Sequence, residues 1–168
     1  MFDRIKERFQ SMGTIKALCE QAEQHARQDQ QKEPGAEHFL LAALDLPDGT
    51  ARRAFEAIGA DPDAFRPAIA RQYADALKML GLPAGLAAGL TEPEPAPAQH
   101  AVFDAAPSGK AVMQTLAEGR DSHNPLLGAH VVAIVAAMPH GVAARALRAM
   151  DIDAKALQAA AGRILGSQ

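Results

Sequence analysis

The chain has few of the residues that favour strands, disulfides or a membrane span. Among its 168 residues there is no Trp, one Tyr and one Cys, and aromatic residues make up only 4%. The single cysteine, Cys19, excludes an internal disulfide framework and is typical of a reducing compartment. No apolar run approaches the roughly 20 residues that a membrane helix needs. An Ala-rich composition with few β-branched runs favours helices over strands.

An excess of charge of either sign is also absent. Lys and Arg number 17 and Asp and Glu number 20, which gives a net charge of −3 and a pI near 6.0. This balance provides no general attraction to nucleic acid or to an anionic membrane. The first twelve residues carry several charges and lack the apolar core of a secretory signal. We therefore expect a cytoplasmic protein that binds neither nucleic acid nor membrane, and one domain rather than two.

The most informative feature that is present is an internal repeat. Residues 35–61 and 127–153 follow the same pattern, and equivalent residues are 92 positions apart. The matched pairs are His38 and His130, Pro47 and Pro139, Gly49 and Gly141, Arg53 and Arg145, and Asp61 and Asp153. Chance does not place five such residue types in one register. Two copies that each expose an apolar face predict a pseudo-twofold domain, because two are too few for a solenoid.

The apolar spacing divides the chain into four segments. They are an N-terminal amphipathic segment at 1–14, a first repeat at 15–80, a proline-rich linker at 81–107 and a second repeat at 108–168. The N-terminal segment is expected to stop at Gly13, and it either packs on its own domain or docks a partner. Val102 and Phe103 are expected to pin the linker onto the body of the domain.

Each repeat is expected to contain four helices. In the first repeat they lie near 14–27, 36–44, 50–58 and 61–80, and in the second near 108–119, 127–138, 142–150 and 153–165. Thr14 and Asp61 are the expected N-caps of the first and fourth helices, and Asp153 repeats the role of Asp61. We also expect an apolar peptide-binding groove at the seam between the two repeats.

The first copy resembles the Clp N-terminal repeat. The resemblance rests on residues 36–44, which read Ala-Glu-His-Phe-Leu-Leu-Ala-Ala-Leu, on the turn at Gly49 and on the Gly-Ala-Asp end of residues 53–61. The second copy is a weaker match, because Ala129 replaces the acidic residue and Asp-Ile-Asp replaces the Gly turn. The resemblance implies an all-α fold in which two pseudo-symmetric four-helix repeats pack as one domain.

The resemblance also implies a function. In full-length Clp unfoldases this domain precedes ATP-driven rings and recruits substrates and adaptor proteins, whereas here we expect a free-standing domain without the ATPase modules. Residues 107–111 are the nearest match to a phosphate loop, and they lack its leading glycine and its hydroxyl residue. We therefore expect a non-catalytic module that binds a protein or peptide, namely a Clp ATPase or protease component or its substrates. The alternatives are a ligand-sensing module and a small hydrolase.

Three residues are candidates for a ligand or peptide site: Glu37, His38 and His130. In some Clp unfoldases the acidic residue at this motif position binds the guanidinium of phosphorylated arginine, and the resemblance transfers that role to Glu37. The alternative is structural. Glu37 would then cap its helix, His38 would sit half-buried and bond to the preceding helix, and His130 would recur through duplication alone.

The residues for metal binding or catalysis are not arranged in a recognisable pattern. None of the six histidines stands four residues from another, and no cysteine pair exists, so no metal is expected. Cys19 lies on the apolar stripe of a helix, where a thiol is normally inert. No catalytic residue and no cofactor is expected.

Overall fold

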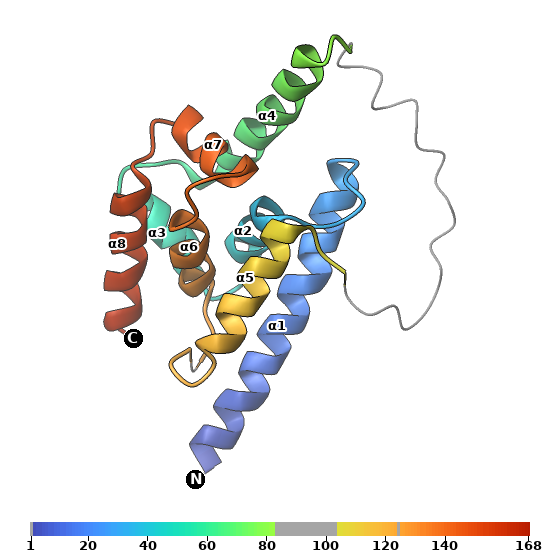
Figure 1. Cartoon of the computed structure of the whole chain (residues 1–168). Coiled ribbons are helices and arrows are strands. Elements are labelled where there is room, and N and C mark those ends of the chain that lie inside the picture. The colour runs from blue at the N-terminus through green and yellow to red at the C-terminus, as the bar shows by residue number, and fades with distance from the viewer. Residues whose placement is uncertain (1, 83–103, 124) are drawn as a thin grey trace.

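The computed structural model describes residues 2–82, 104–123 and 125–168, and within these ranges every regular element is helical (Figure 1). The first copy contains α1 (Phe2–Gln28), α2 (Ala36–Asp45), α3 (Thr50–Glu56), the short 3-10 helix η1 (Pro62–Ala64) and α4 (Phe65–Met79). The second contains α5 (Pro107–Glu118), α6 (Gly128–Ala136), α7 (Val142–Ala149) and α8 (Ala154–Gly166). The all-α double repeat is therefore confirmed. The expected contacts of Val102 and Phe103 lie outside the described residues.

The repeat mates α2 and α6 pack against each other at the centre of the molecule (Figure 1). Every residue of α2 from Ala36 to Leu44 is buried, as suits a helix that is covered on all sides. At the start of α6, a Cβ on Gly128 would lie 2.9 Å from the carbonyl oxygen of Ala43 and 3.0 Å from the Cβ of Ala51. The seam is filled by this close packing, so the groove expected between the repeats was wrong for the described residues.

The two copies share one hydrophobic core. Leu18, Phe39 and Phe55 from the first copy belong to the same buried cluster as Val132 and Leu157 from the second. Each copy buries its apolar face against the other, which neither could do alone. This mutual burial explains why a sequence with two copies folds as one body.

The turns that begin the later helices are repeated as well. Gly49 precedes α3 with a φ of +67°, and Gly141 precedes α7 with a φ of +104°, a region that favours glycine. Asp61 and Asp153 each accept a backbone N–H bond at 2.9 Å from the residue two positions later. The expected repetition of the Asp61 cap at Asp153 is therefore confirmed.

The break expected at Gly13 and the helix start expected at Thr14 were wrong. Helix α1 continues through Gly13, because one glycine costs a helix only about 1 kcal/mol relative to alanine. Thr14 lies inside this helix and donates its hydroxyl to the carbonyl of Gln10, so it is not an N-cap. The fourth helix starts after Asp61, as expected, but its first turn is the 3-10 helix η1 and α4 follows from Phe65. Pro67 is accommodated in the first turn of α4, where no intrahelical N–H is required.

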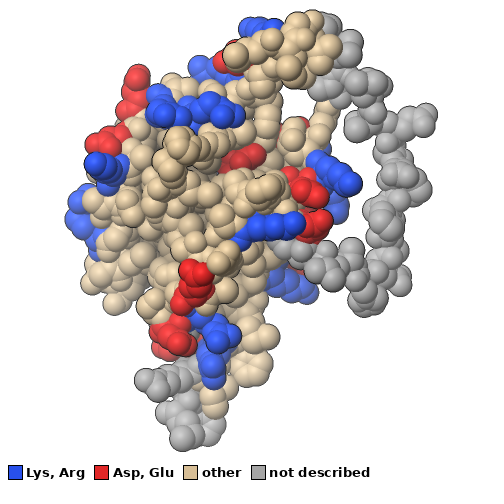
Figure 2. Space-filling model, viewed as in Figure 1, with Lys and Arg blue, Asp and Glu red and all other residues tan. Residues whose placement is uncertain are grey.

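The free ends of α1 and α4 project from the body in different directions (Figure 1). On α1, Phe9 is 70% exposed and Met12 is 66% exposed, and on α4, Met79 is 90% exposed. Ser11 accepts a hydrogen bond from the Leu126 N–H at 3.2 Å, so α1 meets the second copy near this point. The N-terminal segment therefore contacts the second copy at Ser11, while Phe9 and Met12 remain largely exposed. None of the described helices is both long and apolar enough to cross a membrane. On the face shown in Figure 2, basic and acidic side chains are interspersed.

Candidate functional site

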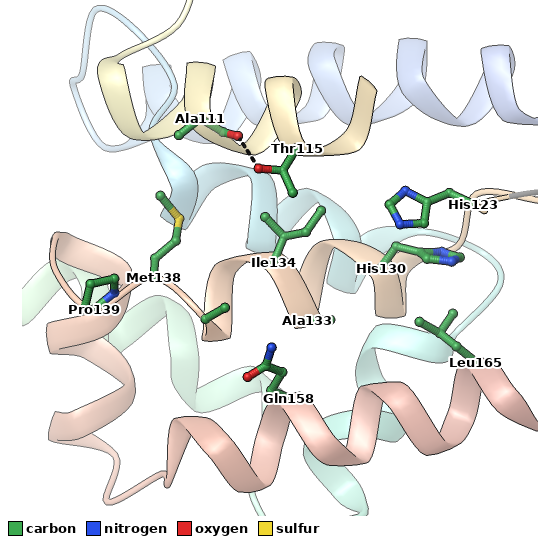
Figure 3. Close-up of a pocket in the computed structure, with 11 residues that line it drawn as sticks. Ala111, Thr115, His123, His130, Ala133, Ile134, Met138, Pro139, Gln158 and Leu165 are labelled. Atoms are coloured by element: carbon green, nitrogen blue, oxygen red, sulfur yellow. Dashed lines mark hydrogen bonds between the residues drawn. The ribbon is translucent and has the colours of Figure 1, made fainter. Parts of the chain in front are cut away.

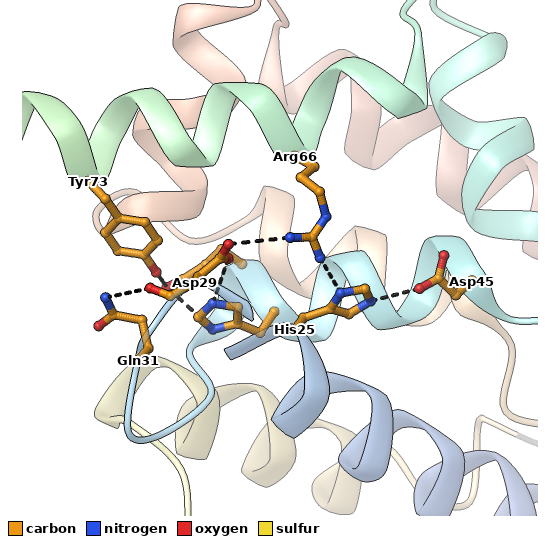
Figure 4. Close-up of polar contacts among 8 residues, drawn as sticks. His25, Asp29, Gln31, Asp45, Arg66 and Tyr73 are labelled. Atoms are coloured by element: carbon orange, nitrogen blue, oxygen red, sulfur yellow. Dashed lines mark hydrogen bonds and ion pairs between the residues drawn. The ribbon is translucent and has the colours of Figure 1, made fainter. Parts of the chain in front are cut away.

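A network of polar side chains lies in the first copy, where α4 faces α1 and α2 (Figure 4). We call it the polar cluster, and its members are His25, Asp29, Glu37, His38, Asp45, Arg66 and Tyr73. It includes two of the three candidate site residues. The third, His130, lies in the second copy.

His38 caps the central helix of the first copy. Its Nδ1 accepts a hydrogen bond from the Gly35 N–H at 2.9 Å, which leaves the proton of the neutral ring on Nε2. That Nε2–H donates to Asp29 Oδ2 at 3.1 Å, so His38 also bonds to the segment that follows α1. The side chain is fully buried, not half-buried as the sequence suggested, and both ring nitrogens are occupied.

Glu37 bonds to α4 and not to backbone N–H groups at the start of its helix. Its Oε1 accepts a hydrogen bond from the Tyr73 hydroxyl at 2.5 Å, and only 6% of the residue is exposed. The carboxylate folds back over Gly35, where an added Cβ would lie 2.6 Å from Oε2. Burial raises the pKa of Tyr73, and the charge of Glu37 raises it further. The helix cap expected of Glu37 is therefore supplied by His38.

Arg66 joins the remaining members of the polar cluster. One guanidinium nitrogen donates to Asp29 Oδ1 at 3.3 Å, and the other donates to Nδ1 of His25. His25 then donates from Nε2 to Asp45 Oδ2 at 2.7 Å. A buried charge is costly without a partner, and Asp29, the most buried carboxylate of this chain of bonds, has two. The polar cluster therefore holds α4 against α1 and α2 through satisfied contacts.

His130 repeats the capping role of His38 in the second copy. Its Nδ1 accepts a hydrogen bond from the Leu127 N–H at 3.0 Å at the start of α6. The next two N–H groups are capped by the first copy: Gly128 donates to Asp48 Oδ2 at 3.1 Å and Ala129 donates to Thr50 Oγ1 at 2.9 Å. Burial lowers the pKa of His130 to about 4, and His123 contributes to the shift.

His130 also borders an open hollow of about 470 Å³ between α5, α6 and α8 (Figure 3). His123 lies beside it at the same end, with the two ring centroids 4.3 Å apart. The remaining walls are largely apolar and include Ala133, Ile134, Met138 and Leu165. No Lys, Arg, Asp or Glu lines this hollow. Its volume lies within the range of about 300–1,000 Å³ of ligand pockets, but the hollow is open to solvent and would cover only part of a ligand.

A second hollow of about 490 Å³ continues from the first between α6, α7 and α8. The two hollows adjoin, because both are lined by Ala137, Met138, Pro139 and Gln158, and we call them together the α6–α8 groove. Arg148, Lys155 and Asp153 line its second end, and the Asp153 carboxylate accepts the backbone N–H of Lys155 at 2.9 Å. Both basic residues are exposed, and neither forms an ion pair with any described residue. The groove therefore runs from an uncharged end to an end where two basic side chains outnumber one carboxylate, which we call the cationic end.

Three other kinds of site have little support in the described ranges: a metal site, a reactive thiol and a phosphate loop. They contain no group of three His, Cys, Asp or Glu side chains positioned for a metal ion. Burial raises the pKa of Cys19 to about 11, which keeps the thiol protonated and unreactive near neutral pH. In the segment that partly matches a phosphate loop, Gly109 packs so closely that an added Cβ would lie 2.3 Å from the Pro34 carbonyl oxygen. Lys110 pairs with Asp104 at 2.9 Å.

The candidate residues thus fall into two places. Glu37 and His38 lie in the closed polar cluster, whereas His130 lies at one end of the open groove. Inspection of the sequence missed Arg66 and Tyr73 as partners of this motif, and it missed Arg148 and Lys155 as groove residues. The sequence did carry a signal for these residues, because the repeat register aligns each of them with a residue of different chemistry in the other copy.

Comparison with known proteins identifies the fold family. The sequence profile of the Clp repeat (R) N-terminal domain matches residues 14–110, which is more than half of the chain. The match spans the first copy and ends within the first turn of α5. The resemblance drawn from the motif around Glu37 is therefore confirmed. The search of curated proteins gave no match.

Proposed function

The chain belongs to the Clp repeat N-terminal domain family, and on that basis we propose that it is a non-catalytic module that binds peptide segments for a Clp machine. Domains of this family are protein-interaction modules. The observation that carries the proposal is the open α6–α8 groove, with its apolar walls and a few polar groups at its ends.

The partner under this proposal is a Clp ATPase or protease component, or a substrate of one. The module acts as an adaptor that delivers substrates or as a decoy that withholds them. A shallow groove that buries a few side chains gives micromolar affinity, because losses of freedom on binding cancel much of the contact energy. Such weak and reversible binding suits the transfer of a substrate to a motor.

The test is capture of partners by the immobilised chain, with identification of the captured proteins by mass spectrometry. We expect Clp unfoldase subunits or their clients in the eluate of the unaltered chain. A chain with Ala137→Trp, which fills the junction of the two hollows, is expected to capture less of them. Retrieval of neither class of protein by the unaltered chain would contradict the proposal.

A second candidate function is recognition of phosphorylated arginine at Glu37. It is favoured by the retained carboxylate and by Arg145 of α7, which lies close enough to act on Tyr73. A guanidinium must compete with the Tyr73 hydroxyl for the Glu37 carboxylate. We expect phosphoarginine to raise the melting temperature, Tyr73→Phe to enlarge that shift and Glu37→Gln to abolish it. An unchanged melting curve for all three chains would exclude this function.

A further inference from the structure

The polar cluster and the first hollow of the α6–α8 groove occupy equivalent places in the two copies. The repeat register of 92 residues aligns four members of the polar cluster with four residues that line the hollow. The pairs are His38 and His130, Asp45 and Ala137, Arg66 and Gln158, and Tyr73 and Leu165. The same crevice of the repeat is therefore filled in one copy and open in the other.

The substitutions explain why the second crevice is open. In the first copy Arg66 spans from α4 to Asp29 and His25, and these bonds occupy the space between the helices. Its mate Gln158 makes no comparable bond to α5, and the mate of Asp45 is only the methyl group of Ala137. The first copy shows that this repeat can fill its crevice, so the hollow is not a requirement of the fold.

The charge at the other end of the groove is also reversed between the copies. The repeat mates of Arg148 and Lys155 are Glu56 and Asp63. Asp63 accepts a hydrogen bond from Arg52 at 2.6 Å and is neutralised within its own copy. Arg148 and Lys155 have no acidic partner among the described residues. Asp153 lies at the same end, where it caps α8, so this end of the groove has a net charge of +1. Arg148 and Lys155 are the two cations that an acidic ligand can neutralise.

The histidine end accepts an uncharged group. The Nδ1 of His130 is an acceptor for the Leu127 N–H, which leaves an N–H on the other ring nitrogen. Burial lowers the pKa of both His123 and His130, so both rings are neutral at pH 7. With apolar walls and no charged lining residue, this end favours an aliphatic side chain over a carboxylate or an ammonium group.

The length of the groove limits the ligand to a short segment. Helix α8 lines both ends, with Lys155 at the cationic end and Leu165 at the histidine end. At a helix rise of 1.5 Å per residue these positions are about 15 Å apart. An extended peptide covers that distance in about five residues.

We propose that the α6–α8 groove binds an extended peptide segment with an aliphatic side chain beside His123 and His130 and carboxylates beside Arg148 and Lys155. The inference rests on the proposed function, since it names the chemistry of the peptide that the module recognises. It predicts an order of features along the ligand: leucine or methionine at one end and two acidic residues three to five positions away.

Fluorescence anisotropy with a labelled peptide tests this assignment. The probe is the fluorescein-labelled hexapeptide Leu-Ala-Ala-Gly-Glu-Glu, titrated with the full chain at low salt. Micromolar binding is expected. Replacing the leucine by serine is expected to weaken binding about tenfold or more, because apolar burial is lost. Replacing both glutamates by lysines is expected to weaken it about tenfold, and added salt should reduce this difference.

Matched variants locate the binding surface. Ala137→Trp and the double change Arg148→Glu with Lys155→Glu are each expected to weaken binding of the probe about tenfold. The control is Arg53→Glu with Arg71→Glu, which alters net charge equally at exposed residues outside the groove. The control should bind like the unaltered chain. Thermal unfolding of each variant checks that it is folded, and the altered peptides test the same contacts without any change to the protein.

Two results would overturn the inference. If the probe binds and neither groove variant weakens it, the chain binds peptides elsewhere, so the proposed function stands and this site assignment fails. If the probe does not bind at millimolar protein, or if the lysine peptide binds as well as the glutamate peptide, the stated ligand chemistry is wrong. The capture of Clp components then decides the proposed function separately.

Discussion

At the scale of single residues, both repeats keep a histidine that caps the central helix, but the surroundings of that histidine differ between the copies. His38 and His130 each accept the N–H of the residue three positions earlier and so begin the central helix of their copy. His38 is enclosed and bonds to Asp29, whereas His130 borders a hollow and lies against His123. The sequence placed both histidines in one register, but it could not show which one faces open space.

The low pKa of His130 predicts a pH dependence of stability. In the folded chain its pKa is about 4, and in the unfolded chain it returns to about 6.5. Between these values the unfolded chain binds a proton that the folded chain excludes. The free energy of unfolding therefore falls as the pH is lowered from 6.5 to 4, by at most about 3 kcal/mol from this residue. Denaturant unfolding across this pH range measures the loss.

Substitution of His130 isolates its part of this pH dependence. In His130→Asn the amide oxygen can still accept the Leu127 N–H, but the side chain does not titrate. We expect the fall in unfolding free energy to be smaller in this variant than in the unaltered chain. His140→Asn, at an exposed position, serves as the control and should keep the full fall. Equal slopes for His130→Asn and the unaltered chain would show that His130 is not the titrating group.

At the scale of elements, the regular apolar spacing made most helices predictable. Residues 36–44 are apolar around the whole helix, and Asp61 and Asp153 carry clear capping signals. The break expected at Gly13 failed because a local glycine penalty is smaller than the gain from a continuous helix. The α6–α8 groove could not be predicted in this way, since it depends on how far apart three separate helices pack.

Helix α1 provides a test of this explanation. Gly13 has helical geometry, and an added Cβ at this position would meet no atom within 4 Å. Gly13→Ala should therefore raise the free energy of unfolding by about 0.5–1 kcal/mol, because alanine loses less conformational freedom in a helix. Chemical denaturation measures the change. A loss of stability in Gly13→Ala would mean that α1 is interrupted at this residue.

At the scale of the whole molecule, the two copies form one body through close contact of their central helices. A Cβ at Gly128 would press on Ala43 and Ala51, and the first N–H groups of α6 are capped by Asp48 and Thr50. Gly128→Ala should lower the free energy of unfolding by about 1–3 kcal/mol, the usual cost of overpacking. The unfolding transition should remain single. If the free energy of unfolding of Gly128→Ala equals that of the unaltered chain, the two copies are less closely packed at this position than described.

In the molecule as a whole, charged side chains of the polar cluster close the crevice of the first copy, whereas the equivalent crevice of the second copy is open and can take a ligand. Methionines report on the alternative binding surfaces: Met138 lies in the α6–α8 groove, Met12 on the exposed start of α1 and Met79 at the exposed end of α4. Single Met→Leu substitutions assign the methyl signals of a chain labelled with ¹³C-methyl methionine.

The most direct measurement is the shift of these methyl signals on addition of the unlabelled leucine–glutamate peptide. We expect the Met138 signal to move with peptide concentration while those of Met12 and Met79 stay in place. Movement of Met12 or Met79 with Met138 unchanged would contradict the central claim.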